Sequence, residues 1–206
     1  NTGEVMSCGY NNYGELGVGD ENGRTELVSI YAIAPYDKTN AVSISAFWSG
    51  IVILLKTGEV MCCGRGDWGQ MGDGNWDNRT ELVSMNASGN YDKTNAISVT
   101  VGYGGTYILL NTGEVMGCGR NNYGQLGVGD FTNRNELVSM NASGNYDKTN
   151  AVAISSGTYY IGILLNTGEV MACGQFSYGQ LGIGPGSTNE NYRFLSMNAS
   201  GNYDKT

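Results

Sequence analysis

This sequence contains no histidine and few charged side chains. Only 15% of its 206 residues are Asp, Glu, Lys or Arg, against about 25% in ordinary soluble domains. Without histidine the chain lacks the usual general base of enzymes and the commonest zinc ligand. Paired carboxylates are present, but none recurs in apolar surroundings that would raise a pKa. We therefore expect no catalytic residue, no metal, no cofactor and no enzymatic activity.

Basic residues and long apolar runs are also scarce. The chain has 11 Lys and Arg against 19 Asp and Glu, which gives a net charge of −8. Binding to a phosphate backbone needs clustered Lys and Arg, so nucleic acid is not an expected partner. No apolar run approaches the roughly 18 residues of a membrane-spanning helix, so we expect no insertion into a membrane.

What the chain does have is an internal repeat of constant period, since TGEV begins at Thr2, Thr57, Thr112 and Thr167. A fixed period of this length indicates a repeat architecture. The predicted units are residues 1–55, 56–110, 111–165 and a truncated fourth unit, 166–206, which together form one repeat domain. By comparison with the first unit, the fourth lacks its last sixteen residues.

The five cysteines follow the same period. Four of them, Cys8, Cys63, Cys118 and Cys173, are each one period apart and so occupy one repeated position, while Cys62 stands beside Cys63. Equivalent positions in neighbouring repeats normally lie too far apart for a disulfide, which needs Cα atoms within about 7 Å. We expect small buried thiols on a strand rather than bridges or a metal cluster.

Each unit carries the signals of four short strands. In the third unit they are predicted at Glu114–Cys118, Glu136–Met140, Ala151–Ser155 and Ile161–Leu165, bounded by glycine and polar turn residues. No segment shows a helical period. Four short antiparallel strands are the content of one propeller blade. The predicted fold class is therefore all-β, with β-propeller-type blades of four antiparallel strands in an incomplete ring or an open array.

A glycine-rich loop follows the first strand of each unit. In the third unit Gly124, Gly127 and Gly129 recur with the period, which indicates positive φ angles or close backbone contacts. The apolar residue between them, Leu126, is predicted to plug the core between two blades.

That loop resembles the repeat of the regulator of chromosome condensation family. The family's blade carries an x-N-x-x-G-Q-L-G-x-G loop after a strand; RNNYGQLGVGD matches it at residues 120–130, and every other unit holds a variant. The family strand's Trp is Cys here in each unit, and the family's His after the strand-turn glycine is absent. The resemblance implies a β-propeller, and it does not imply the nucleotide exchange on the Ran GTPase that one member performs.

A closed ring of this family needs more blades than these units supply. We expect the chain to be a window on a longer array, to close a ring with another copy, or to polymerise through its strand edges. Extracellular and bacterial members of the superfamily include surface proteins and a secreted β-lactamase inhibitor. The resemblance to them implies an extracellular or cell-surface location. The expected function is a non-enzymatic structural or interaction module of a surface or secreted protein, whose partner is itself or another protein.

Aromatic residues in the predicted turns and loops are the candidate binding surface: Trp48, Trp68, Trp76, Tyr103 and Tyr159. Exposed aromatic rings stack on sugars or bury into protein partners, and they can equally pad contacts between blades. A carbohydrate-binding, lectin-like propeller with glycans as partners is therefore the alternative function. A hydrolase in a propeller pocket is a third, less favoured because such a site needs unique residues and this chain repeats itself.

Four N-x-[ST] sequences are glycosylation candidates, at Asn78, Asn86, Asn141 and Asn198. Three of them occupy one repeated position in a connection that should be exposed. In a secreted protein they would carry a regular row of sugars, although duplication also copies a chance sequence.

Overall fold

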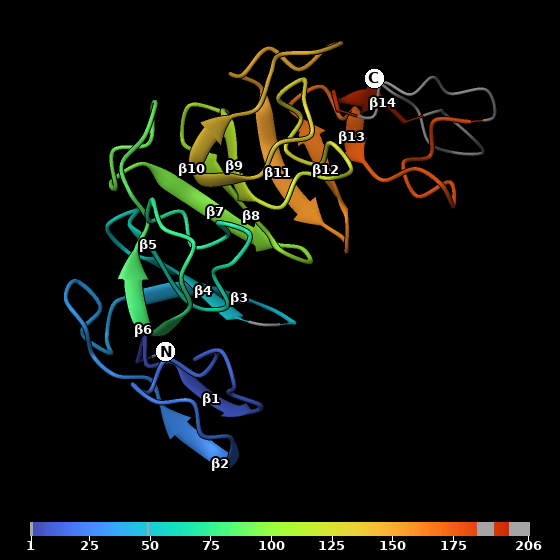
Figure 1. Cartoon of the computed structure of the whole chain (residues 1–206). Coiled ribbons are helices and arrows are strands. Elements are labelled where there is room, and N and C mark those ends of the chain that lie inside the picture. The colour runs from blue at the N-terminus through green and yellow to red at the C-terminus, as the bar shows by residue number, and fades with distance from the viewer. Residues whose placement is uncertain (1, 49, 185–191, 198–206) are drawn as a thin grey trace.

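The computed structural model describes residues 2–48, 50–184 and 192–197, and all their regular elements are β-strands (Figure 1). The strands are β1 Met6–Gly9, β2 Arg24–Ser29, β3 Ala41–Phe47, β4 Gly50–Leu55, β5 Val60–Gly64, β6 Arg79–Ser84, β7 Ala96–Val101, β8 Gly105–Leu110, β9 Val115–Gly119, β10 Arg134–Ser139, β11 Ala151–Ser156, β12 Tyr160–Leu165, β13 Val170–Gly174 and β14 Leu195–Ser196. Over these residues we find no helix with the length and apolar character to cross a membrane.

The strands form three four-stranded antiparallel sheets and one two-stranded sheet. Their orders are β3-β4-β5-β6, β7-β8-β9-β10, β11-β12-β13-β14 and β1-β2. The sheets follow one another around an arc (Figure 1), and β7 lies against both β3 and β11 on the concave side. These are propeller blades that make up about half of a ring, so the predicted all-β fold with blades of four antiparallel strands is confirmed.

Each four-stranded sheet crosses a boundary between sequence repeats. In the first one, β3 and β4 come from residues 1–55, whereas β5 and β6 come from residues 56–110. A tight turn joins the two parts, in which the Gly58 amide donates to the Leu55 carbonyl at 3.0 Å and Gly58 has a φ of +89°. The sequence period and the blade therefore have the same length but a different starting point.

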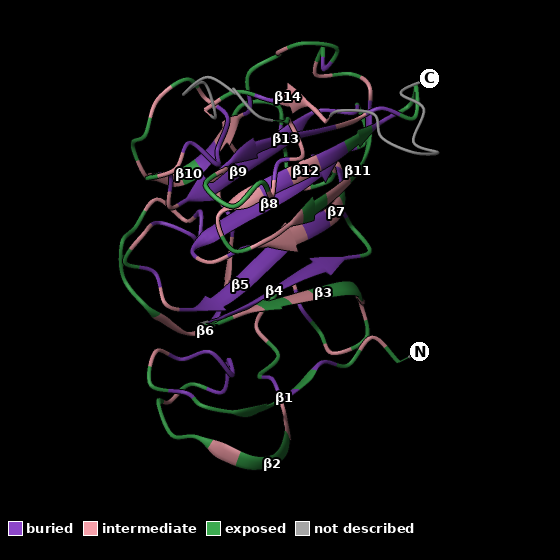
Figure 2. Cartoon of the chain, turned by 90° about the vertical axis from the view of Figure 1, so that its right-hand side faces the viewer, coloured by how far each residue is buried: buried purple, intermediate pink, exposed green. Residues whose placement is uncertain are grey.

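The core lies between successive sheets. The middle strands β4, β5, β8 and β9 are buried throughout, while the first strand of each sheet exposes apolar residues on the concave side (Figure 2). Leu126 packs in one apolar cluster with Cys173 and Phe194 of the following sheet. The predicted role of Leu126 as a plug between blades is confirmed.

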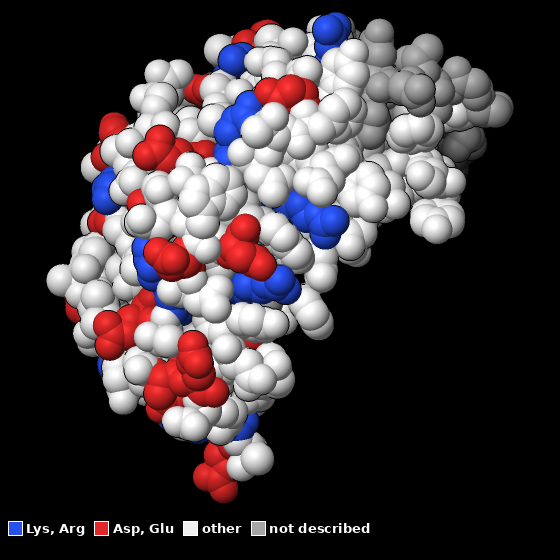
Figure 3. Space-filling model, viewed as in Figure 1, with Lys and Arg blue, Asp and Glu red and all other residues white. Residues whose placement is uncertain are grey.

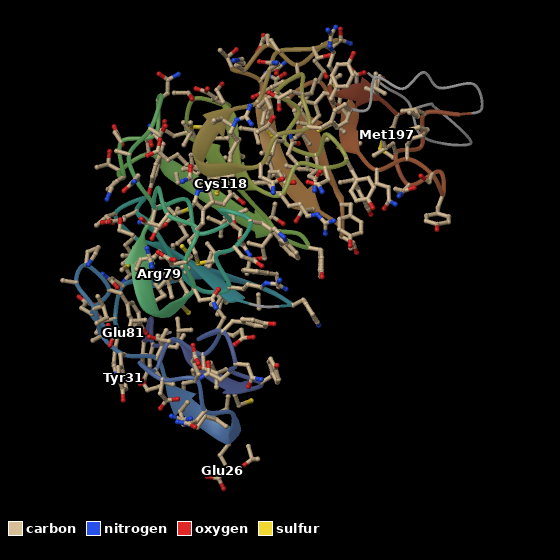
Figure 4. All side chains as sticks on the ribbon, in the orientation of Figure 1. Glu26, Tyr31, Arg79, Glu81, Cys118 and Met197 are labelled. Atoms are coloured by element: carbon tan, nitrogen blue, oxygen red, sulfur yellow. The ribbon has the colours of Figure 1, made fainter. Side chains whose placement is uncertain are left out.

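Four of the five cysteines are buried, Cys8 is exposed, and none of them forms a disulfide. Figure 4 shows Cys118 inside the body of the molecule. Burial raises the pKa of the Cys63 thiol to about 12. It also raises the pKa of the other buried thiols, Cys62, Cys118 and Cys173. The expectation of buried, unbridged thiols holds for these four, and it is wrong for Cys8, which is unbridged but exposed on β1.

These thiols give a testable prediction, because the thiolate is the reactive form of cysteine. In the native 206-residue chain at about pH 8, an aromatic disulfide reagent should modify Cys8 rapidly and the buried thiols at least about 100-fold more slowly. Absorbance of the released thiolate should report one fast thiol in buffer and five in denaturant. Cys8→Ser should abolish the fast phase, and a second fast thiol in the native chain would contradict the prediction.

Candidate functional site

Two connections of each blade leave the sheet at the same end. Gly50 of β4 pairs with Gly64 of β5, so the β3–β4 turn lies beside the loop that follows β5. The same pairing joins Gly105 and Gly119 in the next blade. The turns carry Trp48, Tyr103 and Tyr159, and the loops carry Tyr13, Trp68 and Tyr123. Aromatic residues from the first three repeats thus gather at one end of the blades.

Four of the five predicted binding residues meet there. The ring centroid of Tyr103 lies 5.5 Å from that of Trp48, 5.1 Å from that of Trp68 and 5.3 Å from that of Tyr159. Trp76 does not join them: it lies in the loop between β5 and β6, is 47% exposed and has no ring contact among the described residues. The structure therefore does not bring Trp76 together with the other four predicted binding residues.

Two arginines that were not among the candidate binding residues fill the spaces between the rings. The guanidinium of Arg120 lies 4.9 Å from the ring centre of Trp68 and 5.2 Å from that of Tyr159. Arg65 lies between Tyr13 and Trp68, at 5.0 and 4.5 Å. A cation over an aromatic face contributes about 0.5–1 kcal/mol at an exposed site and more when desolvated.

We call this set the aromatic–arginine surface; it comprises Tyr13, Trp48, Arg65, Trp68, Tyr103, Arg120, Tyr123 and Tyr159. Its two arginines are one period of the repeat apart in the sequence. That spacing was a signal that could have found them.

The two cations differ in their charge partners. Arg65 forms a salt bridge with Asp67 at 2.6 Å, and this hydrogen-bonded carboxylate raises the pKa of Arg65. Arg120 makes no such salt bridge in the part of the chain that the structure describes. Figure 3 shows separate basic patches at the concave margin of the molecule. Among the described residues, the surface therefore presents one guanidinium, that of Arg120, without a salt bridge.

A repeated hydrogen bond fixes the loop aromatics. The amides of Tyr13, Trp68 and Tyr123 each donate to the side chain two residues further on, to Glu15 Oε2, Gln70 Oε1 and Gln125 Oε1, at 2.8, 3.0 and 3.0 Å. All three acceptors are buried. Because the acceptor side chain is held by its surroundings, the aromatic backbone before it is held in place.

The described glycosylation candidates are not members of this surface, but Asn78 adjoins it, because its Oδ1 accepts a hydrogen bond from the amide of Gly66, next to Arg65, at 3.1 Å. Asn78 and Asn141 are exposed, Asn86 is half-buried, and Asn198 lies outside the described residues. The serines of two of these sequences have a packing role: Ser88 and Ser143 donate to the carbonyls of Leu137 and Phe194 in the following sheet, at 2.9 and 3.0 Å. Recurrence of the motif thus has a structural cause, and its use as a sugar acceptor stays a prediction.

Comparison with known protein families and sequences locates the repeat. Residues 96–125 match the family described as regulator of chromosome condensation (RCC1) repeat. The chain is 27% identical over 187 residues to the regulator of chromosome condensation of Drosophila melanogaster. This alignment covers 87% of this chain and 31% of the relative. It is 25% identical over 182 residues to the ultraviolet-B receptor UVR8 of Arabidopsis thaliana. This alignment covers 88% of this chain and 39% of the relative.

Solved structures agree with the fold. Human WBSCR16 superimposes with a TM-score of 0.82 at 20% identity, over 98% of this chain and 50% of that one. Yeast RCC1 (Prp20), solved bound to Kap60, superimposes with a TM-score of 0.77 at 17% identity, over 98% and 47%. This chain therefore spans about half the length of the solved relatives, and less of the curated ones. One repeat segment, residues 96–125, thus matches the RCC1 repeat model, and the sheets of this chain superimpose on the blades of RCC1-type β-propellers.

Proposed function

We propose that this chain is a non-enzymatic interaction module that binds another protein through its aromatic–arginine surface. The observation that carries the proposal is Arg120, whose guanidinium is held over Trp68 and Tyr159 without a carboxylate partner among the described residues. A preorganised cation of this kind can pair with an acidic group of a partner at little further entropic cost.

The composition of the surface supports a protein partner. Trp, Tyr and Arg are the residues most enriched at the energetic centres of protein interfaces. Trp48 is 68% exposed, while Trp68, Tyr103 and Tyr159 are half-buried by one another. The rings thus remain accessible but lose little rotamer freedom on binding, because their stacking already fixes them.

One solved relative, yeast RCC1 (Prp20), is described together with protein partners in two structures. One structure has it bound to Kap60, and the other is described with its binding properties to Gsp1p and histones. Those partners belong to that protein. They support a protein-binding role for a propeller of this type, and the partner of the present chain is left to experiment.

Photo-crosslinking tests the proposal. With benzoylphenylalanine in place of Tyr159, the chain should crosslink to a polypeptide in extract from its source organism, and Arg120→Ala should reduce the yield strongly. Loss of a hot-spot arginine costs about 2 kcal/mol or more, which is about 30-fold in affinity. The matched control is Arg24→Ala, because Arg24 pairs with Asp20 outside this surface.

A second crosslinker position makes the result specific. Leu27 is exposed on β2, away from the aromatic–arginine surface. Equal crosslinking from positions 27 and 159, or crosslinking at 159 that survives Arg120→Ala, would count against the proposal.

Carbohydrate binding remains the second candidate, because a hollow of about 210 Å³ is lined by Phe47, Trp48, Val101 and Tyr103, with Gly157 nearby. Such a shallow aromatic hollow suits stacking of a sugar ring. Competition by free saccharides in the crosslinking experiment would favour this candidate over a protein partner.

Self-assembly into a larger ring or filament, and an extracellular or cell-surface location, stay predictions. Sedimentation of the purified 206-residue chain tests the first, with a concentration-dependent rise in mass as the expected result. Localisation of the tagged protein in its source cells tests the second.

A further inference from the structure

A cavity of about 480 Å³ opens in the first repeat, at one end of the aromatic–arginine surface. Tyr10, Tyr13, Glu15 and Trp48 line it. Tyr10 and Trp48 are 61% and 68% exposed, and the Tyr10 and Tyr13 ring centroids lie 6.4 Å apart. Three aromatic side chains and one carboxylate thus surround a space of the size that small-molecule sites have, about 300–1,000 Å³.

The second repeat fills the equivalent place with a cation of its own. One period after Tyr10 stands Arg65, whose guanidinium lies 4.5 Å from the Trp68 ring centre. Tyr103, one period after Trp48, stacks on Trp68 at 5.1 Å.

The third repeat does the same. Arg120, one period after Arg65, lies over Tyr123 at 5.9 Å and over Tyr159 at 5.2 Å, and these two rings stack at 4.8 Å. Two repeats therefore hold a guanidinium of the chain among their rings. The first repeat has a tyrosine at that position and a cavity beside it.

The first repeat also carries a negative charge that the other two lack. Glu15 stands where they have Gln70 and Gln125. It is only 6% exposed; its Oε2 accepts the Tyr13 amide at 2.8 Å, and its Oε1 has no hydrogen-bond partner among the described residues. A buried carboxylate oxygen without a partner is unfavourable, and a nearby cation offsets that cost.

Among the described residues, no Lys or Arg forms a salt bridge with Glu15. Arg65 lies 5.0 Å from the Tyr13 ring centre, but its guanidinium is bound to Asp67 at 2.6 Å. The positive charge of Arg65 is thereby balanced, and the carboxylate of Glu15 is left to attract another cation.

We infer that this cavity binds a cation with an N-methylated ammonium head. Aromatic faces around a cation are the arrangement that recognises quaternary ammonium groups, and Glu15 adds the complementary charge. Methyl groups favour such a ligand over a bare ammonium, because they pack on the rings and lower the cost of dehydration. The head can belong to a free small molecule or to a methylated side chain. This inference goes beyond the proposed function, because the site needs no protein partner.

Titration of the 206-residue chain with tetramethylammonium, followed by calorimetry and tryptophan fluorescence, tests the inference. A cation of this size should bind with a Kd in the range of about 1 mM. Neopentyl alcohol, a soluble neutral analogue of similar shape, should bind at least about 10-fold more weakly, because it lacks the cation–π and carboxylate attraction.

Two variants test the site without endangering the fold, because each introduces the residue that neighbouring repeats already carry. Glu15→Gln removes the charge, and Tyr10→Arg supplies an internal guanidinium that should occupy the cavity. Each should weaken tetramethylammonium binding at least about 10-fold. Tyr178→Ala is the matched control, since Tyr178 is 88% exposed and outside the cavity, and it should leave the titration unchanged.

Three further ligands identify which kind of molecule carries the methylated ammonium head. They are a peptide with trimethyllysine, its unmodified counterpart and choline. A trimethyllysine peptide that binds at least about 10-fold more tightly than choline assigns a methylated side chain, and equal binding assigns a free small molecule. Absence of cation binding, equal binding of the neutral analogue, or full binding by both Glu15→Gln and Tyr10→Arg would overturn the inference. The titration shares no readout with crosslinking at position 159, so either proposal can fail alone.

Discussion

Replacement of Gly69 by alanine is expected to lower the free energy of unfolding by at least about 3 kcal/mol. Gly69 has a φ of +80°, where a residue with a Cβ atom is strained by about 1–2 kcal/mol. An added Cβ would also lie 2.5 Å from the Arg134 carbonyl oxygen and 2.6 Å from the Asn135 Cα. Both atoms are backbone of the following sheet, so the blades would have to move apart. Urea denaturation followed by circular dichroism measures the loss.

The last repeat offers the control that separates strain from the clash. Gly179 occupies the equivalent position with a φ of +77°, but an added Cβ there would meet nothing within 4 Å in the described part of the chain. Gly179→Ala should therefore cost only the strain, about 1–2 kcal/mol. Equal losses at Gly69 and Gly179 would show that close contact between blades is not what requires glycine.

Truncation of Leu126 to alanine is expected to cost about 2–5 kcal/mol. Leu126 is fully buried between two sheets, in a cluster with Cys173 and Phe194. Its removal leaves a cavity that the strands on both sides can close only by shifting, and denaturation in urea should show a lower midpoint.

Two matched variants accompany this prediction. Leu126→Met introduces the residue found one period earlier, Met71, and should cost less than about 1.5 kcal/mol. Leu164→Ala, at a partly exposed position of β12, should cost less than Leu126→Ala. A loss below about 1 kcal/mol for Leu126→Ala would mean that the blades do not depend on this plug.

The strands could be predicted because their signals are local. In the third repeat the predicted strand at 136–140 appears as β10, and the one at 161–165 as β12, with bounds that differ by one or two residues. The tight turn at 166–168, between β12 and β13, is equally local, with Gly168 at a φ of +92°. Alternating apolar residues and glycines fix these elements within a few residues of chain.

The site was less predictable, because its contacts join residues about one period apart. Periodicity shows that Arg65 and Arg120 are equivalent, but it does not show that Arg120 reaches rings of two repeats. The loop aromatics Tyr13 and Tyr123 were not among the candidate binding residues, and the structure makes them half-buried parts of the aromatic–arginine surface. Which rings meet depends on how one blade is placed against the next, and no local pattern encodes that placement.

The offset between repeat and blade has a consequence for how such an array grows and how it comes apart. Any window that is one period long contains one blade's worth of strands, whatever its first residue. A tandem duplication therefore inserts a whole blade wherever the break in the gene falls. If the segment from one TGEV to the next became disordered, by contrast, β5 would be lost from its partner β4 and β8 from its partner β9. Two sheets would then be damaged at once. The array can lengthen by single blades, but it is expected to melt as a unit.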